Sequence, residues 1–100
     1  MNFETINAKK VEEYARNNNG IIIDVRNPDN YIKGHIPKAI NIPYNMFEEV
    51  KSKLPKDKIL ILYCERGSLS LILCRDLCKE GFNVKNVYGG ISSYRGEIEL

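Results

Sequence analysis

The stretch Ile59-Leu60-Ile61-Leu62-Tyr63, followed by Cys64-Glu65-Arg66-Gly67-Ser68, contains the strongest structural signal in the chain. Residues 59–63 are apolar at every position, without the alternation of a half-exposed strand, and this is typical of a strand covered on both faces of a parallel sheet. A cysteine and a short glycine-containing loop come next, and a helix is expected after them. The stretch therefore predicts a buried strand that ends at a reactive side chain.

Working outward, a second apolar run at residues 21–25 is expected to lie beside the first in the sheet. Shorter strands are expected at residues 3–6, 39–42 and 84–88, and helical segments at about 7–16, 28–33, 45–54 and 68–80. Strands that alternate with helices in this way predict one α/β domain over residues 1–100. We expect a small, mostly parallel five-stranded sheet with helices on both faces.

Two of these boundaries carry clear local signals. Asn7 is a plausible N-cap for the first helix, and Asn17-Asn18-Asn19-Gly20 is a turn signal before the second strand. In the last helix, four apolar residues recur at helical spacing and are expected to face the sheet, and Gly81 is expected to end that helix. These four residues are Leu69, Ile72, Leu73 and Leu77.

The composition is that of an ordinary globular chain and excludes several classes of protein. Of 100 residues, 43% are hydrophobic and 28% are charged, and the net charge of +2 is spread along the chain, so we expect no nucleic-acid partner. No apolar run approaches the roughly 20 residues of a membrane-spanning helix, and no secretory signal is recognisable, so we expect a cytoplasmic protein without a membrane partner. Three irregularly spaced cysteines and one histidine favour neither a disulfide framework nor a structural metal site.

Two segments place chemically competent side chains where predicted strands end. They are Asp24-Val25-Arg26 and Cys64-Glu65-Arg66-Gly67-Ser68, and ligands of open α/β sheets bind beyond the carboxyl ends of the strands. The short loop after Cys64 can turn several backbone N–H groups inward, and the next helix adds the partial positive charge of its N-terminus. Both effects lower the pKa of a thiol, so Cys64 is predicted to be a nucleophile.

Three groups of residues occur in a specific order along the chain. The first is Ile22-Ile23-Asp24-Val25-Arg26-Asn27-Pro28 with Tyr31, Gly34-His35-Ile36-Pro37, Ala39 and Asn41-Ile42-Pro43; the second is Tyr63-Cys64-Glu65-Arg66-Gly67-Ser68-Leu69-Ser70; the third is Gly81-Phe82, Val84, Val87 and Gly89-Gly90-Ile91. In this order they resemble the rhodanese-like (thiosulfate sulfurtransferase) family over nearly the whole chain.

The resemblance implies a rhodanese-type sulfurtransferase. The Cys64 thiolate would take the outer sulfur of a donor such as thiosulfate or a persulfide, hold it as a persulfide, and pass it to a thiophilic acceptor such as cyanide, a thiol or a protein. The persulfide is anionic, so the N–H groups of the loop would stabilise it. The residues expected to bind the substrate are Glu65, Arg66, Gly67, Ser68 and Leu69. The resemblance implies no metal or organic cofactor, and we expect a monomer or a weak homodimer.

The sequence departs from the family pattern at two positions. Many members have arginine where this chain has Leu69, so the usual cationic contact to an anionic donor is missing there, and Arg66 is expected to substitute for it in part. This departure predicts weak activity with thiosulfate and better activity with persulfide donors. Tyr94 stands where the family often has tryptophan, and we interpret that change as a matter of packing.

Other residues near the predicted site have competing interpretations. His35 could be a general base for Cys64, but the resemblance favours a structural role, and Asp24 and Arg26 are expected to organise the loops. Glu65 would raise the pKa of the thiol if its carboxylate is close, or would help to select a cationic or protein partner if it points outward. The sequence leaves these two roles of Glu65 open.

Parts of the sequence are also compatible with functions other than sulfur transfer from a small donor. Cys74 and Cys78 could be metal ligands or resolving thiols, although core packing is favoured because they lie among apolar residues. A cysteine phosphatase would need the pattern C-x5-R, and the sixth residue after Cys64 is Ser70. A docking module without catalysis, and an enzyme that accepts sulfur only from a protein persulfide, are the remaining alternatives.

Overall fold

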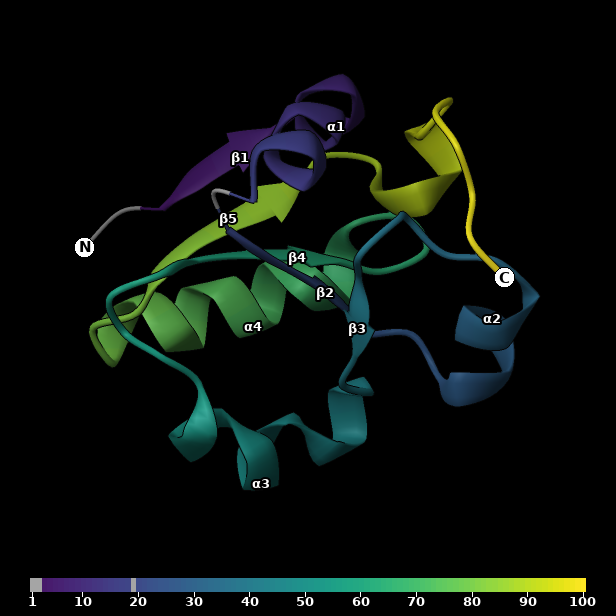
Figure 1. The fold of residues 1–100 in the computed structure, drawn as a ribbon. Coiled ribbons are helices and arrows are strands. Elements are labelled where there is room, and N and C mark those ends of the chain that lie inside the picture. Colours follow the sequence, from purple (N-terminus) through teal and green to yellow (C-terminus); the bar gives the residue numbers. More distant parts are fainter. Residues whose placement is uncertain (1–2, 19) are drawn as a thin grey trace.

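The computed structural model describes residues 3–18 and 20–100. Met1 and Asn2 lie outside the described residues, and so does Asn19 of the turn expected at residues 17–20. Five strands form one sheet in the order β1-β5-β4-β2-β3, and every neighbouring pair is parallel (Figure 1). Their bounds are β1 Glu4–Ile6, β2 Ile21–Asp24, β3 Ile40–Asn41, β4 Ile59–Tyr63 and β5 Asn83–Val87. The predicted five-stranded α/β sheet is confirmed, with the strand that precedes Cys64 at its centre.

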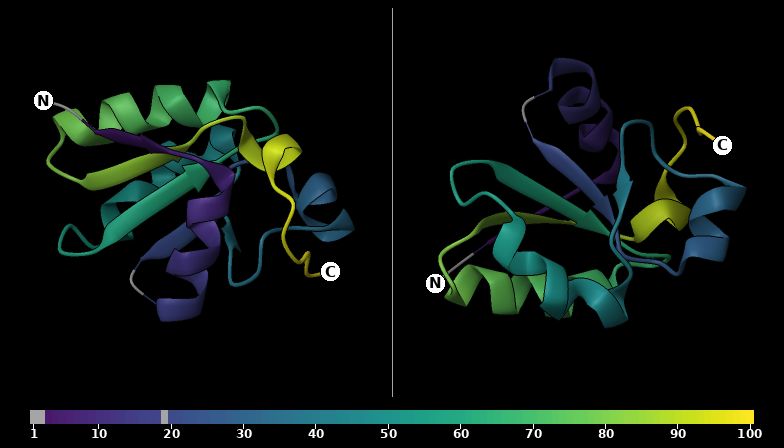
Figure 2. Two further views of the ribbon diagram at one scale, coloured as in Figure 1. Left: turned by 90° about the horizontal axis from the view of Figure 1, so that it is seen from above. Right: turned by 60° about the horizontal axis from the view of Figure 1, so that its bottom comes forward.

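Helices cover both faces of the sheet, as expected. The 10-residue helix α1 (Ala8–Asn17) and the short 3-10 helix η3 (Gly90–Ser93) contact each other on one side, and α3 (Phe47–Val50) and α4 (Ser68–Lys79) lie on the other (Figures 1 and 2). Helix α2 (Pro28–Lys33) follows β2 and lies near the C-terminal segment (Figure 1). Among the described residues, no helix combines the length and the apolar character needed to cross a membrane.

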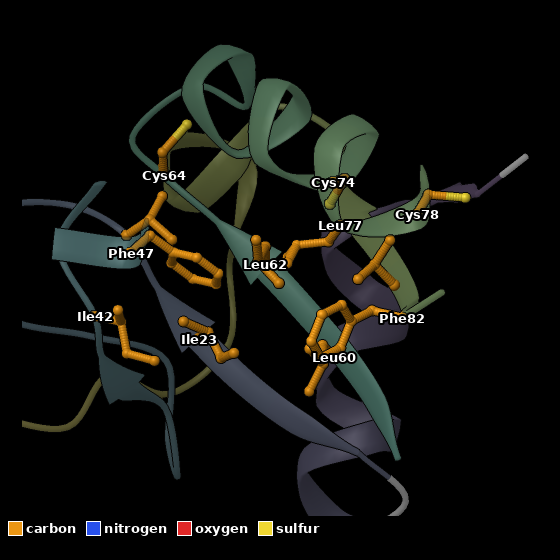
Figure 3. Packing of buried hydrophobic residues seen from close by; sticks show 12 residues of the cluster. Ile23, Ile42, Phe47, Leu60, Leu62, Cys64, Cys74, Leu77, Cys78 and Phe82 are labelled. Atoms are coloured by element: carbon orange, nitrogen blue, oxygen red, sulfur yellow. The ribbon is translucent and has the colours of Figure 1, made fainter. Parts of the chain in front are cut away.

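The central strand β4 separates two hydrophobic clusters because its side chains alternate between the faces. Leu60, Leu62 and Cys64 belong to the cluster that α3 and α4 cover (Figure 3), whereas Ile61 and Tyr63 belong to the cluster on the α1 side. Both sets are almost completely buried. The continuous apolar run at residues 59–63 is therefore explained by a strand that needs apolar side chains on both faces.

Asparagine side chains cap the starts of the first two helices, and the cap of the first helix was predicted from the sequence. The side chain of Asn7 caps α1 by accepting a hydrogen bond from the backbone N–H of Lys10 at 2.9 Å, and Asn27 caps α2 in the same way through the N–H of Asn30. Gly81 follows the end of α4 with a φ of +93°, as its predicted role requires.

The prediction of one continuous helix at residues 45–54 is wrong. The segment consists of the 3-10 helix η1 (Tyr44–Met46), one turn of α-helix in α3, and the 3-10 helix η2 (Lys51–Lys53). Phe47 is the buried residue of these three turns. Phe47 and the partly buried Val50 and Leu54 pack against the core cluster. A segment this short has little helical stability of its own, so this packing decides its conformation.

The prediction of which face of α4 packs on the sheet is also partly wrong. Leu69 and Ile72 are exposed, by 43% and 42%, whereas Leu77 is buried as expected. The buried residues of the helix are Ser70, Cys74, Leu77 and Cys78. The rotation of the helix brings the polar Ser70 inward, where hydrogen bonds described below hold it against Cys64 and β5.

Candidate active site

Cys64 lies directly after the central strand, under the loop that leads into α4. Its side chain is almost completely buried, with 3% of the residue exposed, yet it forms part of the wall of a surface cleft. The backbone N–H of Gly67 donates a hydrogen bond to its Sγ at 3.0 Å. The loop thus turns a backbone donor toward the sulfur, as the sequence predicts.

The surroundings of the sulfur act on its acidity in opposite directions. Burial raises the pKa of the Cys64 thiol, but the Ser70 hydroxyl and the backbone N–H groups of Ser70, Gly67 and Leu69 favour the thiolate, and the net pKa is lowered. These donors come from the loop and the first turn of α4. The site is therefore suited to hold negative charge on sulfur.

Two close backbone contacts hold the loop in place. The N–H of Ile91 donates to the Cys64 carbonyl oxygen and that of Ser92 donates to the Glu65 carbonyl oxygen, both at 3.0 Å. These donors follow Gly90, whose φ is +59° and where a Cβ atom would lie 2.4 Å from the Cys64 carbonyl oxygen. Gly90 is thus needed for the close approach of η3 to the loop.

The cleft beside Cys64 has a volume of about 540 Å³. Its walls come from the end of β2, the start of α2, η1 and the loop after β4. The lining residues are Val25, Arg26, Asn27, Asn30, Pro43, Tyr44, Asn45, Cys64, Glu65, Arg66, Ser68 and Leu69. Of the residues predicted to bind substrate, Glu65, Arg66, Ser68 and Leu69 line the cleft, whereas Gly67 contributes its N–H to the sulfur and packs against the β5 end.

Asp24 and Arg26 form a buried ion pair at the edge of the cleft. The Arg26 guanidinium binds both carboxylate oxygens of Asp24, with Nη2 to Oδ2 at 2.8 Å, and also donates to the Gly34 carbonyl oxygen at 2.6 Å. The Tyr63 hydroxyl donates to Asp24 Oδ2 at 2.7 Å and accepts from the Ile36 N–H at 3.1 Å. Asp24 and Arg26 therefore connect β2, β4 and the segment after α2, the organising position expected for them.

Of the two roles considered for Glu65, close to the thiol or pointing outward, the structure favours the outward orientation. Its side chain is 58% exposed, and its Oε1 lies 3.6 Å from Nη1 of Arg26. The Glu65 carboxylate is therefore directed toward solvent and Arg26.

His35 lies outside the cleft wall. Its ring stacks on Tyr31 with centroids 3.8 Å apart, its Nδ1 is 3.0 Å from the Tyr31 carbonyl oxygen, and its Nε2 is 3.5 Å from Glu99. The backbones of His35 and Glu99 exchange two hydrogen bonds of 2.9 Å. These contacts hold the C-terminal segment, so a general-base role of His35 for Cys64 has no support in the geometry.

Cys74 and Cys78 pack in the core under α4 (Figure 3). Burial raises the pKa of Cys74 to about 12, with smaller contributions from Cys78 and Cys64, and this keeps its thiol protonated and unreactive at neutral pH. Within residues 3–18 and 20–100, no group of histidine, cysteine and carboxylate side chains is arranged to hold a metal ion. Tyr94 is buried in the cluster on the α1 side, in agreement with a packing role.

Sequence reasoning missed the polar residues behind the sulfur. Ser70 is fully buried, with its Oγ 3.5 Å from Cys64 Sγ, and it is bonded to Asn86 of β5, which is 4% exposed. β5 is polar at Asn83, Lys85 and Asn86, so its sequence alone does not mark Asn86 as the polar residue that faces the core. A buried amide needs a polar partner, and Asn86 has one in Ser70.

Comparisons with known proteins identify the family. The family model of the rhodanese-like domain matches residues 7–97, and the chain belongs to this family. A solved structure of a rhodanese-related protein from Thermoplasma volcanium is 31% identical, and the match covers 98% of this chain and 99% of that one with a TM-score of 0.90. The expected rhodanese-like fold is thus confirmed.

Two curated relatives are named sulfurtransferases. The "Putative sulfurtransferase YtwF" of Bacillus subtilis is 36% identical over 78% of this chain and 76% of its own length. A "tRNA sulfurtransferase" of Desulfurococcus amylolyticus is 39% identical over 79% of this chain, and the match spans only 16% of that relative. These relatives support sulfur transfer in general, and hence a transferase, as the class of activity.

Proposed function

We propose that this protein moves a sulfane sulfur from thiosulfate or a persulfide, through a persulfide on Cys64, to a thiophilic acceptor such as cyanide, a thiol or a protein. The observation that carries the proposal is the position of Cys64 Sγ, which accepts the Gly67 N–H at 3.0 Å and lies at the wall of the cleft. A lowered thiol pKa supplies the thiolate that the reaction needs.

The reaction is a covalent relay in two steps. In the first, the Cys64 thiolate attacks the outer sulfur of the donor, a new S–S bond forms, and the donor's own S–S bond breaks so that sulfite or a thiolate leaves with the electron pair. In the second, the acceptor attacks the outer sulfur of the persulfide and the Cys64 thiolate is released. Since negative charge stays near the same loop throughout, the fixed backbone N–H groups stabilise both states.

We propose that persulfides are better donors than thiosulfate. Leu69 lines the cleft in place of a cation, and the Arg26 guanidinium at the opposite wall is already paired with Asp24 and Glu65. Arg66 is the remaining cation among the residues that line the cleft. A dianionic donor would therefore find few charged partners, whereas a persulfide with an apolar substituent would contact Leu69 and Tyr44.

A protein persulfide is the second candidate donor. Leu69 and Ile72 are neighbours on α4 and are each more than two-fifths exposed, and Tyr44 at the cleft is 37% exposed. These apolar side chains beside the entrance could contact a protein that presents its persulfide on a loop.

The proposal is tested by steady-state kinetics with thiosulfate, and separately with a small alkyl persulfide, as donors and cyanide as acceptor. Cys64→Ser should abolish transfer from both donors, while the control Cys78→Ser, which removes a thiol from the other end of α4, should retain it. Parallel lines in the double-reciprocal plots would support the covalent relay. Full transfer by a folded Cys64→Ser variant would contradict the proposal, and a pure docking module would show no transfer in either protein.

A further inference from the structure

The Ser70 hydroxyl has one proton and three acceptors within reach. Its Oγ lies 2.6 Å from Asn86 Oδ1, 3.3 Å from the Gly67 carbonyl oxygen and 3.5 Å from Cys64 Sγ. A hydroxyl donates its single proton to one acceptor, and the 2.6 Å contact is the one with the distance of a strong O–H···O bond. In the resting site the proton therefore points toward Asn86 and away from the sulfur.

The orientation of the Asn86 amide follows from its second contact. Its Nδ2 lies 3.4 Å from the Gly67 carbonyl oxygen, which can only accept. The amide nitrogen consequently faces the carbonyl, and Oδ1 is the atom that faces Ser70. Ser70 is fully buried and Asn86 is 4% exposed, so bulk water does not compete for these bonds.

We infer that Asn86 is a positioning residue that holds the Ser70 proton away from Cys64 while the sulfur is neutral and yields it when the sulfur becomes anionic. The proton stays on Ser70 Oγ in both states, and only the direction of the O–H bond changes. A hydrogen bond to an anion is stronger than one between neutral groups, so the hydroxyl turns toward a thiolate. Asn86 Oδ1 then loses its donor inside the core, and this cost opposes formation of the anion.

The charged and titratable groups around Cys64 come from four elements, and they do not take part in the hydrogen bonds between which the Ser70 hydroxyl changes. They are Arg26 after β2, Glu65 and Arg66 in the loop, Tyr44 in η1 and Cys74 in α4. Within the part of the chain that the structure describes, none of them hydrogen bonds to Ser70 or Asn86. A substitution of Asn86 therefore changes the hydrogen bonds of Ser70 without removing a charge.

The inference deepens the proposed function, because it concerns the same sulfur, but its test needs no sulfur donor. The measurement is the rate of Cys64 alkylation by iodoacetamide from about pH 5 to 10, followed by mass spectrometry of the Cys64 peptide so that the other cysteines do not interfere. Cys64 can titrate as inferred even if sulfur transfer fails, and the reverse also holds. Failure of one claim is thus distinguishable from failure of the other.

The variant Asn86→Leu removes the competing acceptor at similar volume. We expect the midpoint of the alkylation profile to fall by about 0.5 to 1 pH unit, the size of one neutral hydrogen bond of competition. In a Ser70→Ala background the same substitution should leave the midpoint unchanged, because the proton in question is gone. Circular dichroism verifies the fold, and Asn86→Ala, whose side chain also lacks an acceptor, replaces the leucine variant if that variant does not fold.

A merely structural role of Asn86 predicts a different result. Its loss would loosen the first turn of α4, weaken the N–H contacts to the sulfur and raise the midpoint. An unchanged or raised midpoint in folded Asn86→Leu, or an equal fall in the Ser70→Ala background, would overturn the inference.

Discussion

Nη1 of Arg26 lies 3.6 Å from Oε1 of Glu65, so a cation at the end of β2 is paired with the residue that follows Cys64. The same guanidinium holds Asp24 through Nη2 at 2.8 Å. The two pairs differ in burial, because Asp24 is fully buried whereas the Glu65 side chain is 58% exposed. Arg26 therefore forms a buried ion pair with Asp24 and an exposed, screened ion pair with Glu65 of the loop.

The first prediction concerns this difference. Arg26→Met leaves the buried Asp24 carboxylate without its cation and should lower the free energy of unfolding by about 3 to 5 kcal/mol. Glu65→Gln breaks an exposed pair and should change it by less than about 1 kcal/mol. Urea denaturation of both variants provides the measurement. Equal losses in the two variants would show that the burial argument is wrong.

The second prediction concerns the entrance of the cleft. Leu69→Arg places a cation beside the sulfur and should lower the KM for thiosulfate about 10-fold, the effect of one charge-assisted hydrogen bond. Ile72→Arg is the matched control, because it adds the same charge one turn further along α4 at equal exposure and outside the cleft wall. An identical fall in KM for both variants would indicate general electrostatic attraction, and no fall in either would refute the role given to Leu69.

The third prediction concerns the close approach of η3 to the loop. Gly90→Ala forces a Cβ atom to within 2.4 Å of the Cys64 carbonyl oxygen and should reduce sulfur transfer about 10-fold or more by displacing the loop. Gly81→Ala is the control, since its φ of +93° imposes similar backbone strain while nothing lies within 4 Å of the added atom. The control should lose about 1 kcal/mol of stability and keep its activity. Equal activity of the two variants would contradict the claim that the close approach of η3 at Gly90 holds the active-site loop in place.

The fourth prediction concerns alkaline pH. Burial raises the pKa of Cys74 from 9.0 to about 12, so above pH 9 the unfolded chain releases a proton that the native protein keeps. The free energy of unfolding should then fall with pH, by up to about 1.4 kcal/mol per pH unit for this group. Burial and the Asp24 carboxylate also raise the pKa of Tyr63, which adds to the fall above its ordinary pKa of 10.0.

Urea denaturation between about pH 8 and 11 checks this prediction. Both proteins compared should carry Cys64→Ser, because the lowered pKa of Cys64 produces the opposite slope. Adding Cys74→Ala should flatten the decline that begins near pH 9. A decline of the same steepness in both proteins would remove Cys74 as its cause.

The parts of this fold that the sequence predicts well are those with local signals. The central strands β2 and β4 follow from uninterrupted apolar runs, and the start of α1 follows from its capping residue Asn7. The order of motifs also pointed to the family and to a loop that turns N–H groups toward Cys64. All of these features depend on residues close together in the chain.

The features that escaped prediction depend on contacts distant in sequence. Ser70 of α4 faces the core and bonds to Asn86 on β5, a contact that the helix sequence does not reveal. The apolar pattern therefore placed Leu77 correctly but placed Leu69 and Ile72 inward wrongly. The segment at residues 45–54 follows the packing of Phe47, Val50 and Leu54 in the core rather than its helix propensity. Asn86 is one of three polar residues in β5, with Asn83 and Lys85, so its burial and its partner could be recognised only in the folded chain.

The most direct test of the central claim is the intact mass of the reduced protein after incubation with thiosulfate, and separately with a small alkyl persulfide. The account predicts that the wild type and Cys78→Ser each gain one sulfur atom, about 32 Da, that cyanide removes this mass, and that Cys64→Ser gains nothing. The gain should be more complete with the persulfide than with thiosulfate. A folded wild-type protein that gains no sulfur from either donor, or a Cys64→Ser variant that gains it fully, would contradict the claim that Cys64 carries the sulfur.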